Sequence, residues 1–156
     1  IPGEGVELEV TVESTGHINY GPYLGKDRKG IAGMVLLDLQ SQFHWEYELM
    51  PLQDHPAEFG ALPEDSAQAG YRCATFVVDG EPGDTFIEYP GVKGQVWVNG
   101  FNLGRYWDRG PSKTLYVPAP VLKSGENQVV VMEWEKFTTD AVTFADKPNL
   151  GEIPEA

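Results

Sequence analysis

Apolar and polar residues alternate in several short runs along the chain, which is the pattern of β-strands with one buried face. The first run, residues 6–13 (VELEVTVE), places valine and leucine at every second position between glutamate and threonine. A second run, residues 44–49 (HWEYEL), alternates apolar and polar side chains in the same way. Short β-forming runs between turn signals predict further strands at 71–78, 85–89, 95–98, 101–107, 114–117, 128–135 and 143–144.

Two of the predicted strands are apolar on both faces. In residues 31–39, Ile31, Val35 and Leu37 fall on one face, and Met34 and Leu36 fall on the other. Residues 128–135 show the same property, with valines on one face and Val130, Met132 and Trp134 on the other. A two-layer sandwich covers one face of each sheet, so we expect something else to cover the second face.

The dipeptide Asn99-Gly100 lies between two β-forming runs and predicts a two-residue hairpin turn, because a type I′ turn needs positive φ at both central residues. A two-residue loop would set the register. We expect the following cross-strand pairs: Val98 with Phe101, Trp97 with Asn102, Val96 with Leu103, and Gln95 with Gly104.

The predicted register places Val96, Val98, Phe101 and Leu103 on one apolar face. Arg105 would continue on that face, so we expect it to be partly buried and paired with a carboxylate. Trp97 would point to the opposite face. If the valines are core, this indole needs a ligand, a neighbouring domain or a covering loop.

About nine short strands and the absence of a convincing long helix predict an all-β protein, a β-sandwich or barrel. The length of 156 residues favours one domain over 1–156, with a loose tail at 146–156. A single helical turn is expected between Pro118 and Gly125.

The net charge of −13, from 24 acidic and 11 basic residues, disfavours nucleic acid and anionic membranes as partners, and we expect neither. No apolar run is long enough to span a membrane. Cys73 is the only cysteine, so no internal disulfide can form and the compartment stays unknown. The start at Ile1 suggests a processed or excised piece.

Catalysis by this chain alone is not expected. Two pairs of glutamates, Glu46 with Glu48 and Glu133 with Glu135, are each two residues apart on one strand, or roughly 6.6 Å at the backbone. That separation suits an inverting glycosidase. However, acids along one strand face are usually solvated, and a general acid needs surroundings that raise its pKa. We therefore predict no catalytic residue.

Metal sites have weak support in the sequence. With one cysteine and no two histidines at ligand spacing, zinc is not expected. Structural calcium is a minor option at the loop carrying Asp79, Glu81 and Asp84, although this loop does not match the EF-hand pattern. No other cofactor is expected.

Sugar binding is the sharper hypothesis, because aromatic rings stack on the apolar face of galactose while polar groups read its hydroxyls. The alternative is that the same rings form the sandwich core or a domain interface, and we favour it. The candidate carbohydrate-binding residues are Trp97, Asn102, Arg105, Tyr106, Trp107 and Trp45.

Two ordered blocks of the chain resemble the last β-domain of glycoside hydrolase family 35, the β-galactosidases. The longer block is TFIEYPGVKGQVWVNGFNLGRYWDRGPSKTLYVP at 85–118, followed by LKSGEN at 122–127, VVVMEWE at 129–135 and AVTFADKPNLG at 141–151. The shorter one runs from Glu13 to Gly21, includes Asn19, Tyr20 and Gly21, and is followed by Lys29-Gly30-Ile31. The family usually has arginine where this chain has His17.

The resemblance implies a jelly-roll β-sandwich of the galactose-binding kind, with Asn99, Gly100 and Gly104 as structural motif residues. It also implies that the two catalytic glutamates of the retaining enzyme lie on a separate (β/α)8 barrel. The expected role is a non-catalytic C-terminal domain that packs against this barrel and a sister β-domain. The alternative is a module that recognises galactose-containing oligosaccharides.

Overall fold

The computed structural model describes residues 5–14, 16–51, 54–61 and 67–152. The chain divides into two compact units, Ile1–Leu49 and Met50–Ala156. This division differs from the single domain over 1–156 that the length favours. Within the described residues, the strands before Met50 pair with each other, and the strands after it form the other two sheets.

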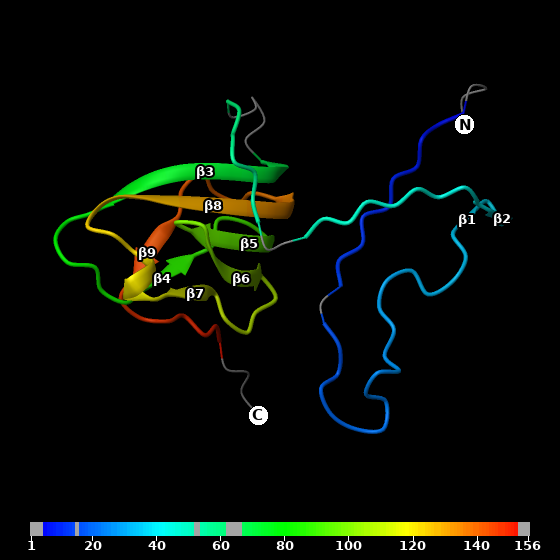
Figure 1. Ribbon diagram of the computed structural model, residues 1–156, viewed down its shortest axis with the longest axis horizontal. Helices are drawn as coiled ribbons and strands as arrows, with labels where there is room; N and C mark the ends of the chain where they lie inside the picture. Colours follow the sequence, from blue (N-terminus) through cyan, green and yellow to red (C-terminus); the bar gives the residue numbers. More distant parts are fainter. Residues whose placement is uncertain (1–4, 15, 52–53, 62–66, 153–156) are drawn as a thin grey trace. The chain divides into compact units, whose positions relative to one another are not determined.

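The second unit is an all-β sandwich of two antiparallel sheets (Figure 1). The four-stranded sheet has the order β3-β8-β5-β6, and the three-stranded sheet has the order β7-β4-β9. The strands of the first sheet are β3 (Gln68–Val78), β8 (Gly125–Lys136), β5 (Lys93–Val98) and β6 (Phe101–Trp107). Those of the second are β7 (Thr114–Val117), β4 (Thr85–Glu88) and β9 (Thr143–Ala145). The jelly-roll class expected from the sequence is confirmed.

The main core lies between the two sheets. Val96 and Val98 of β5 and Val129 and Val131 of β8 point inward from the larger sheet, and Ile87 of β4 meets them from the smaller one. Alternation within β5 and β8 supplies these side chains, because successive residues of a strand point to opposite faces. The remaining buried members are Tyr106, Val117, Leu122 and Phe137.

The β5–β6 hairpin turns at Asn99-Gly100, where both residues have positive φ, of 48° and 79°. The pairs Val98–Phe101 and Trp97–Asn102 form as expected. The next two predicted pairs are wrong, because Val96 lies opposite Gly104 and Gln95 opposite Arg105. A β-bulge inserts Leu103 as an extra residue, and each later side chain of β6 therefore changes face.

The bulge has a local cause in the sequence Asn102-Leu103-Gly104. Gly104 has φ of 105°, a conformation that disfavours residues with a Cβ atom. Its backbone N–H donates a hydrogen bond to the Asn102 Oδ1 atom, at 2.7 Å. Asn102 also donates from Nδ2 to the Gln95 Oε1 atom across the strands, at 3.0 Å. Asn and Gly together thus fix the extra residue that the turn alone does not predict.

The expectation for Arg105 is wrong for the same reason. The side chain of Arg105 is exposed on the outer face of the larger sheet, and Tyr106 takes the inward position instead. No ion pair of Arg105 with a carboxylate is found in the described part of the chain.

A second, smaller apolar cluster covers part of the outer face of the larger sheet. Trp97, Val130 and Met132 form its buried centre, and Phe59 and Trp134 are partly buried against it. Trp97 is 0% exposed. Of the three covers expected for this indole, the structure shows a loop: the ring centroid of His55 lies 5.8 Å from that of Trp97 in an edge-on arrangement.

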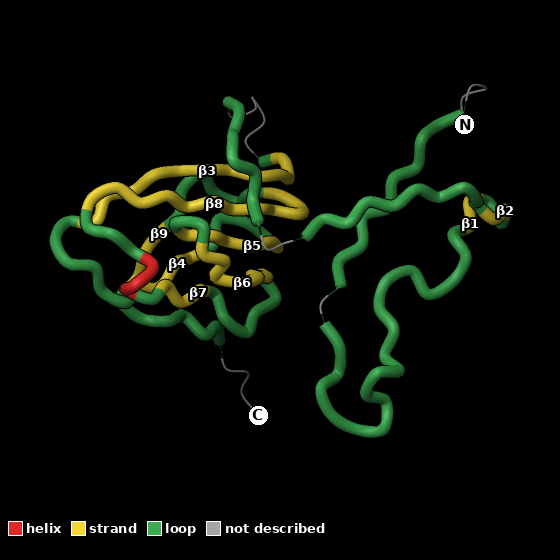
Figure 2. Tube along the Cα trace, in the orientation of Figure 1, coloured by secondary structure: helices red, strands yellow, loops and turns green. Residues whose placement is uncertain are grey.

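The first unit contains little regular structure in its described residues (Figure 2). Its strands are β1 (Leu36–Leu37) and β2 (Gln40–Ser41), which pair only with each other. The strands predicted over 6–13, 31–39 and 44–49 are therefore not formed as expected. An alternating pattern specifies which face would be buried, but a strand also needs a hydrogen-bonding neighbour, and these segments have none in the described structure.

The segment after β9 is attached to the sandwich. The backbone N–H of Asn149 donates to the Thr114 Oγ1 atom at 3.0 Å, and the N–H of Lys113 donates to the Asn149 carbonyl at 2.8 Å. The loose tail expected over 146–156 is thus held as far as Gly151, and 153–156 lie outside the described residues. The helical turn expected after Pro118 is the 3-10 turn η1 (Ala119–Val121). No helix in the described residues is long and apolar enough to cross a membrane.

Candidate functional site

Of the six residues expected to bind carbohydrate, the five in the second unit do not form one platform. Trp97 and Tyr106 are 0% and 2% exposed and lie on opposite faces of the larger sheet. Neither ring offers a free face to a sugar in this structure. Asn102 is half-buried and takes part in the β-bulge. Trp45 lies in the first unit and is considered there.

Arg105 and Trp107 are brought together, and two further cations join them. Above the ring of Trp107 lie Lys93 Nζ at 4.7 Å, Arg109 Cζ at 5.3 Å and Arg105 Cζ at 5.4 Å from the centroid. We call these four residues the Trp107 cluster. The strand register explains its assembly: Lys93 lies directly opposite Trp107, and Arg105 is two residues before it on the same face.

A cleft of about 630 Å³ begins at Arg109. Its walls come from the β6–β7 connection and from the segment after β9, which the Asn149 hydrogen bonds hold in place. The Lys113 ammonium group lies in this wall and donates to the Asp108 carbonyl. The lining residues are Arg109, Gly110, Pro111, Lys113, Asn149, Gly151 and Glu152.

Glu133 is the buried acid of the sandwich, with 1% exposure. Its carboxyl oxygens accept hydrogen bonds from the N–H groups of Val92 (2.8 Å), Lys93 (3.1 Å) and Glu135 (2.8 Å). The Tyr106 hydroxyl donates a fourth bond at 2.7 Å. The expectation that Glu133 and Glu135 are both solvated is therefore wrong for Glu133, whose role is to tie β8 to the start of β5.

The hydrogen bond to Glu133 also affects the pKa of the Tyr106 hydroxyl. Burial raises the pKa of its hydroxyl far above the usual value, and the hydrogen bond to Glu133 raises it further. The ring stacks on Tyr89 with centroids 4.7 Å apart. Gly91 and Gly94 leave room for this arrangement, because a Cβ atom at Gly91 would overlap the Glu133 carboxyl group.

Trp45 of the first unit lines a small apolar pocket of about 270 Å³. Its indole N–H donates to the Gln42 carbonyl at 3.0 Å, and the side chain is 42% exposed. The other lining residues are almost all apolar, from Ile31 to Phe43. The pocket lacks the convergent polar groups that read sugar hydroxyls.

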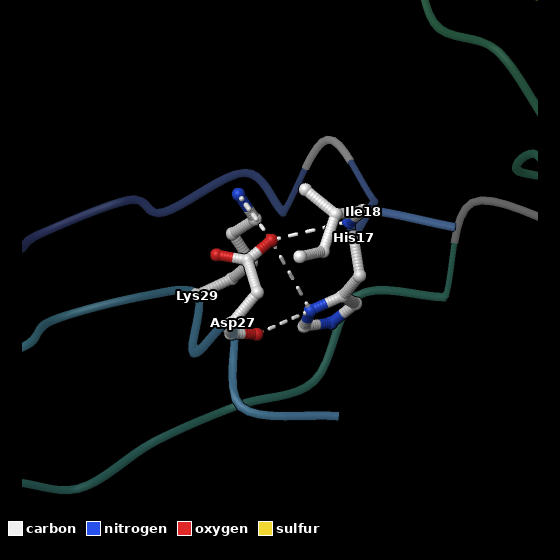
Figure 3. Close-up of polar contacts among 4 residues, drawn as sticks. All are labelled: His17, Ile18, Asp27 and Lys29. Carbon is white, nitrogen blue, oxygen red and sulfur yellow. Dashed lines mark hydrogen bonds and ion pairs between the residues drawn. The ribbon is translucent and has the colours of Figure 1, made fainter. Parts of the chain in front are cut away.

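The N-terminal motif block carries a polar cluster around Asp27 (Figure 3). The Asp27 Oδ2 atom lies 3.0 Å from Lys29 Nζ and accepts a hydrogen bond from the Ile18 N–H at 3.2 Å. His17 Nδ1 lies 2.5 Å from the Asp27 carbonyl oxygen. The bond to Lys29, followed by the bond from Ile18, lowers the pKa of Asp27. His17 thus contacts the backbone at Asp27 through an imidazole nitrogen.

The other motif residues of this block lie at or just before a turn. Tyr20 is 90% exposed, and Gly21, with φ of 104°, starts a turn by accepting a hydrogen bond from the Leu24 N–H. Asn19 is also exposed.

No group of three or more His, Cys, Asp or Glu side chains in the described residues converges in a way that would hold a metal ion. Asp84 accepts a hydrogen bond from the Ala119 N–H at 2.8 Å. That bond, and a second one from Tyr116, lower the pKa of Asp84. Calcium at Asp79, Glu81 and Asp84 stays a prediction that this geometry does not support.

Sequence reasoning missed Lys93, Arg109 and Glu133. A usable signal was present for Lys93, because a hairpin register counted with the Asn-x-Gly bulge places it opposite Trp107. For Glu133 the structure shows that Gly91 leaves the space its carboxyl group fills.

Comparison with known proteins follows the division into two units. The family model for the first all-β domain of β-galactosidases matches residues 1–53, and the model for the β-galactosidase galactose-binding domain matches residues 71–127. The chain therefore matches two β-domains of β-galactosidases, and the resemblance noted from its motifs is confirmed.

Individual proteins agree with these models. The chain is 38% identical to human beta-galactosidase-1-like protein 2, with 92% of this chain and 24% of that protein covered. It is 37% identical to human beta-galactosidase, with 94% and 26% covered. For mouse beta-galactosidase-1-like protein the identity is 36%, with 94% and 24% covered. The chain thus spans about a quarter of the length of the curated relatives it matches.

Proposed function

We propose that this chain supplies the non-catalytic β-domains of a β-galactosidase and stabilises the enzyme by packing against its catalytic (β/α)8 barrel and a sister β-domain. The whole enzyme would hydrolyse terminal β-galactosides. The observation that carries the proposal is the pair of family matches, in order along one chain, to two β-domains of β-galactosidases.

The first unit supports a packing role. Its apolar side chains alternate along the chain but are exposed, including Val6 (60%), Val12 (48%) and Leu49 (81%). An alternating run of exposed apolar side chains offers one face that another protein segment can cover. The relatives carry about three quarters of their length outside the matched region, which is where such a segment would lie.

Within the described residues, Glu133 and Glu135 do not form a hydrolytic pair. The carboxyl group of Glu133 is fully engaged by four donors, and Glu135 is exposed at the end of β8. A glycosidase needs two facing carboxyl groups in a cleft that holds the sugar. We place the catalytic glutamates outside this chain.

A carbohydrate-binding module is the second candidate, and the description of the matched family as a galactose-binding domain favours it. It predicts saturable binding of neutral galactose. The packing role predicts none, because Trp97 and Tyr106 are buried and cations lie over the ring of Trp107.

An association experiment tests the packing role. The chain is co-expressed with human β-galactosidase from which the matching quarter has been removed. We expect the two to copurify and the hydrolysis of 4-nitrophenyl β-galactoside to exceed that of the truncated enzyme alone. The double variant Leu8→Glu, Val10→Glu should weaken the association, because it charges the exposed apolar positions.

The matched control is Glu7→Gln, Glu9→Gln, which changes the alternate positions of the same segment and should leave the association intact. The proposal fails if the truncated enzyme neither binds the chain nor gains activity, or if both double variants behave alike. An NMR titration with galactose and a β-galactosyl oligosaccharide separates the two candidates. Saturable shifts below about 10 mM would favour the binding module.

A further inference from the structure

Positive charge is concentrated in one stretch of this acidic chain. Residues 93–113 carry four cations and one acid, whereas the rest of the chain carries seven cations and 23 acids. Two of the four, Arg105 and Arg109, form no ion pair with any described residue. Bringing like charges together costs free energy, so a structural role alone does not account for this grouping.

The geometry of the Trp107 cluster leaves its two arginines exposed. Arg105, Lys93 and Arg109 approach the ring of the half-buried Trp107, while the side chains of both arginines are exposed. Stacking on an indole fixes the position of a guanidinium group but leaves its in-plane N–H donors free. Such donors match the oxygen pairs of a carboxylate or sulfate.

The adjoining cleft gives the cluster a concave neighbour. Its volume of about 630 Å³ lies in the range of small-molecule sites. Arg109 belongs to both the cluster and the cleft, and Lys113, Asn149 and Glu152 add a cation, an amide and a carboxylate to the wall. The Lys113 ammonium group also donates to the Asp108 carbonyl, so the two arginines are the main groups for an anion. The amide and backbone groups would form hydrogen bonds with the hydroxyls of a bound ligand, and the arginines would bind its negatively charged oxygens.

We propose that the Trp107 cluster and the cleft beside it bind an anionic sugar, one that carries a sulfate or a carboxylate group. At this site a neutral sugar would compete with the cations that lie over the ring of Trp107. Nucleic acid is disfavoured by the net charge of −13. This site shares no residue with the exposed apolar positions of the proposed packing role.

The test is an NMR titration of the full chain with galactose 6-sulfate, galacturonate, galactose and inorganic sulfate. We expect saturable binding of at least one of the two anionic sugars at millimolar concentration, with shifts at the Trp107 indole. Neutral galactose and inorganic sulfate should each bind at least about tenfold more weakly, since one lacks the anion and the other the sugar hydroxyls.

The double variant Arg105→Gln, Arg109→Gln should weaken binding about tenfold or more. The double variant Lys123→Gln, Lys136→Gln removes the same charge from exposed positions elsewhere and should change the affinity less than about twofold. Unchanged signals from the β8 core would show that both variants keep the fold.

The proposal is overturned by the absence of saturable binding at tens of millimolar, by equal losses in the two double variants, or by equal affinity for inorganic sulfate. A glutamate-rich peptide that binds as tightly as the anionic sugar would also overturn it, by assigning the surface to an acidic protein. Barrel association uses Leu8 and Val10 instead, so failure of either proposal can be recognised separately.

Discussion

Glu133 shows how a single charged side chain can be accommodated inside an apolar sandwich. Removing a carboxylate from water is costly unless hydrogen bonds replace its hydration. Three backbone N–H groups and the Tyr106 hydroxyl provide these bonds, and the glycine at 91 leaves the space. The result is a polar link between β8 and the start of β5.

The replacement Glu133→Gln should destabilise the fold by about 2–4 kcal/mol, because the amide nitrogen would face N–H donors that need an acceptor. Glu135→Gln on the same strand is exposed and should change stability by less than about 0.5 kcal/mol. Urea unfolding followed by tryptophan fluorescence measures both. Equal effects of the two substitutions would show that the buried hydrogen bonds of Glu133 add no measurable free energy of unfolding.

Asp84 predicts a dependence of stability on acid pH. Its pKa is lower in the folded chain, chiefly through the bond from the Ala119 N–H, than in the unfolded chain, where it is about 4. The associated stability is therefore fully present above about pH 4 and is lost as the pH falls through the lowered folded pKa. Asp84→Asn should flatten this part of the profile of urea midpoint against pH.

The matched control for this profile is Asp79→Asn, which removes an exposed carboxyl group from the same loop without touching Ala119. If Asp79→Asn flattens the acid profile as much as Asp84→Asn does, the bond to η1 is not its cause.

At the scale of elements, the β5–β6 hairpin separates what sequence could predict from what it could not. Asn99-Gly100 specified the turn and the first two cross-strand pairs, because its backbone conformation depends on those residues alone. The bulge at Leu103 depends on a hydrogen bond that the Gly104 N–H donates to the Asn102 side-chain oxygen. The register predicted without the bulge places Arg105 on the inner face. The candidate site that includes Arg105 was therefore predicted on the wrong face of the sheet.

The bulge predicts a specific cost for Gly104→Ala. The position has open space, but its φ of 105° is unfavourable for a residue with a Cβ atom, so we expect a loss of about 1–2 kcal/mol. Gly83→Ala is the control, since Gly83 also has open space and no positive φ. It should be neutral or stabilise by up to about 1 kcal/mol. Thermal unfolding of both variants gives the comparison.

A loss no larger for Gly104→Ala than for Gly83→Ala would mean that the bulge can be abandoned at no cost. In that case the cross-strand amide signals should move to the regular register, with Val96 opposite Leu103. The Trp107 cluster would then be disrupted, because Arg105 would turn to the inner face.

The outer face of the larger sheet illustrates a second limit of sequence reasoning. Alternation correctly placed Trp97 opposite the core valines and required a cover for it. Which cover was present could not be read, because the loop residues His55 and Phe59 lie some 40 positions earlier and show no periodic pattern. Long-range packing of an irregular loop leaves no local signal.

At the scale of the whole molecule, runs of β-forming residues form long strands in the described part of one unit and not in that of the other. Runs of β-forming residues formed long strands in the second unit, where β3 and β8 pair along most of their lengths. In the first unit, equally regular alternation at 6–12 did not form a strand. Periodicity reports what a segment would bury, and strand formation needs a partner that this pattern cannot supply.

Hydrogen exchange should reveal this difference directly. Amides of β8 and β5, in the centre of the larger sheet, should exchange only through global unfolding, with protection factors of about 10⁴ or more. Amides of residues 6–12 are outside any described strand and should exchange within seconds to minutes. Adding the truncated β-galactosidase of the association experiment should protect 6–12 while leaving β8 unchanged. Strong protection of 6–12 in the chain alone would mean that the segment already has a partner strand, and the apolar surface we assign to the rest of the enzyme would not be free to bind it.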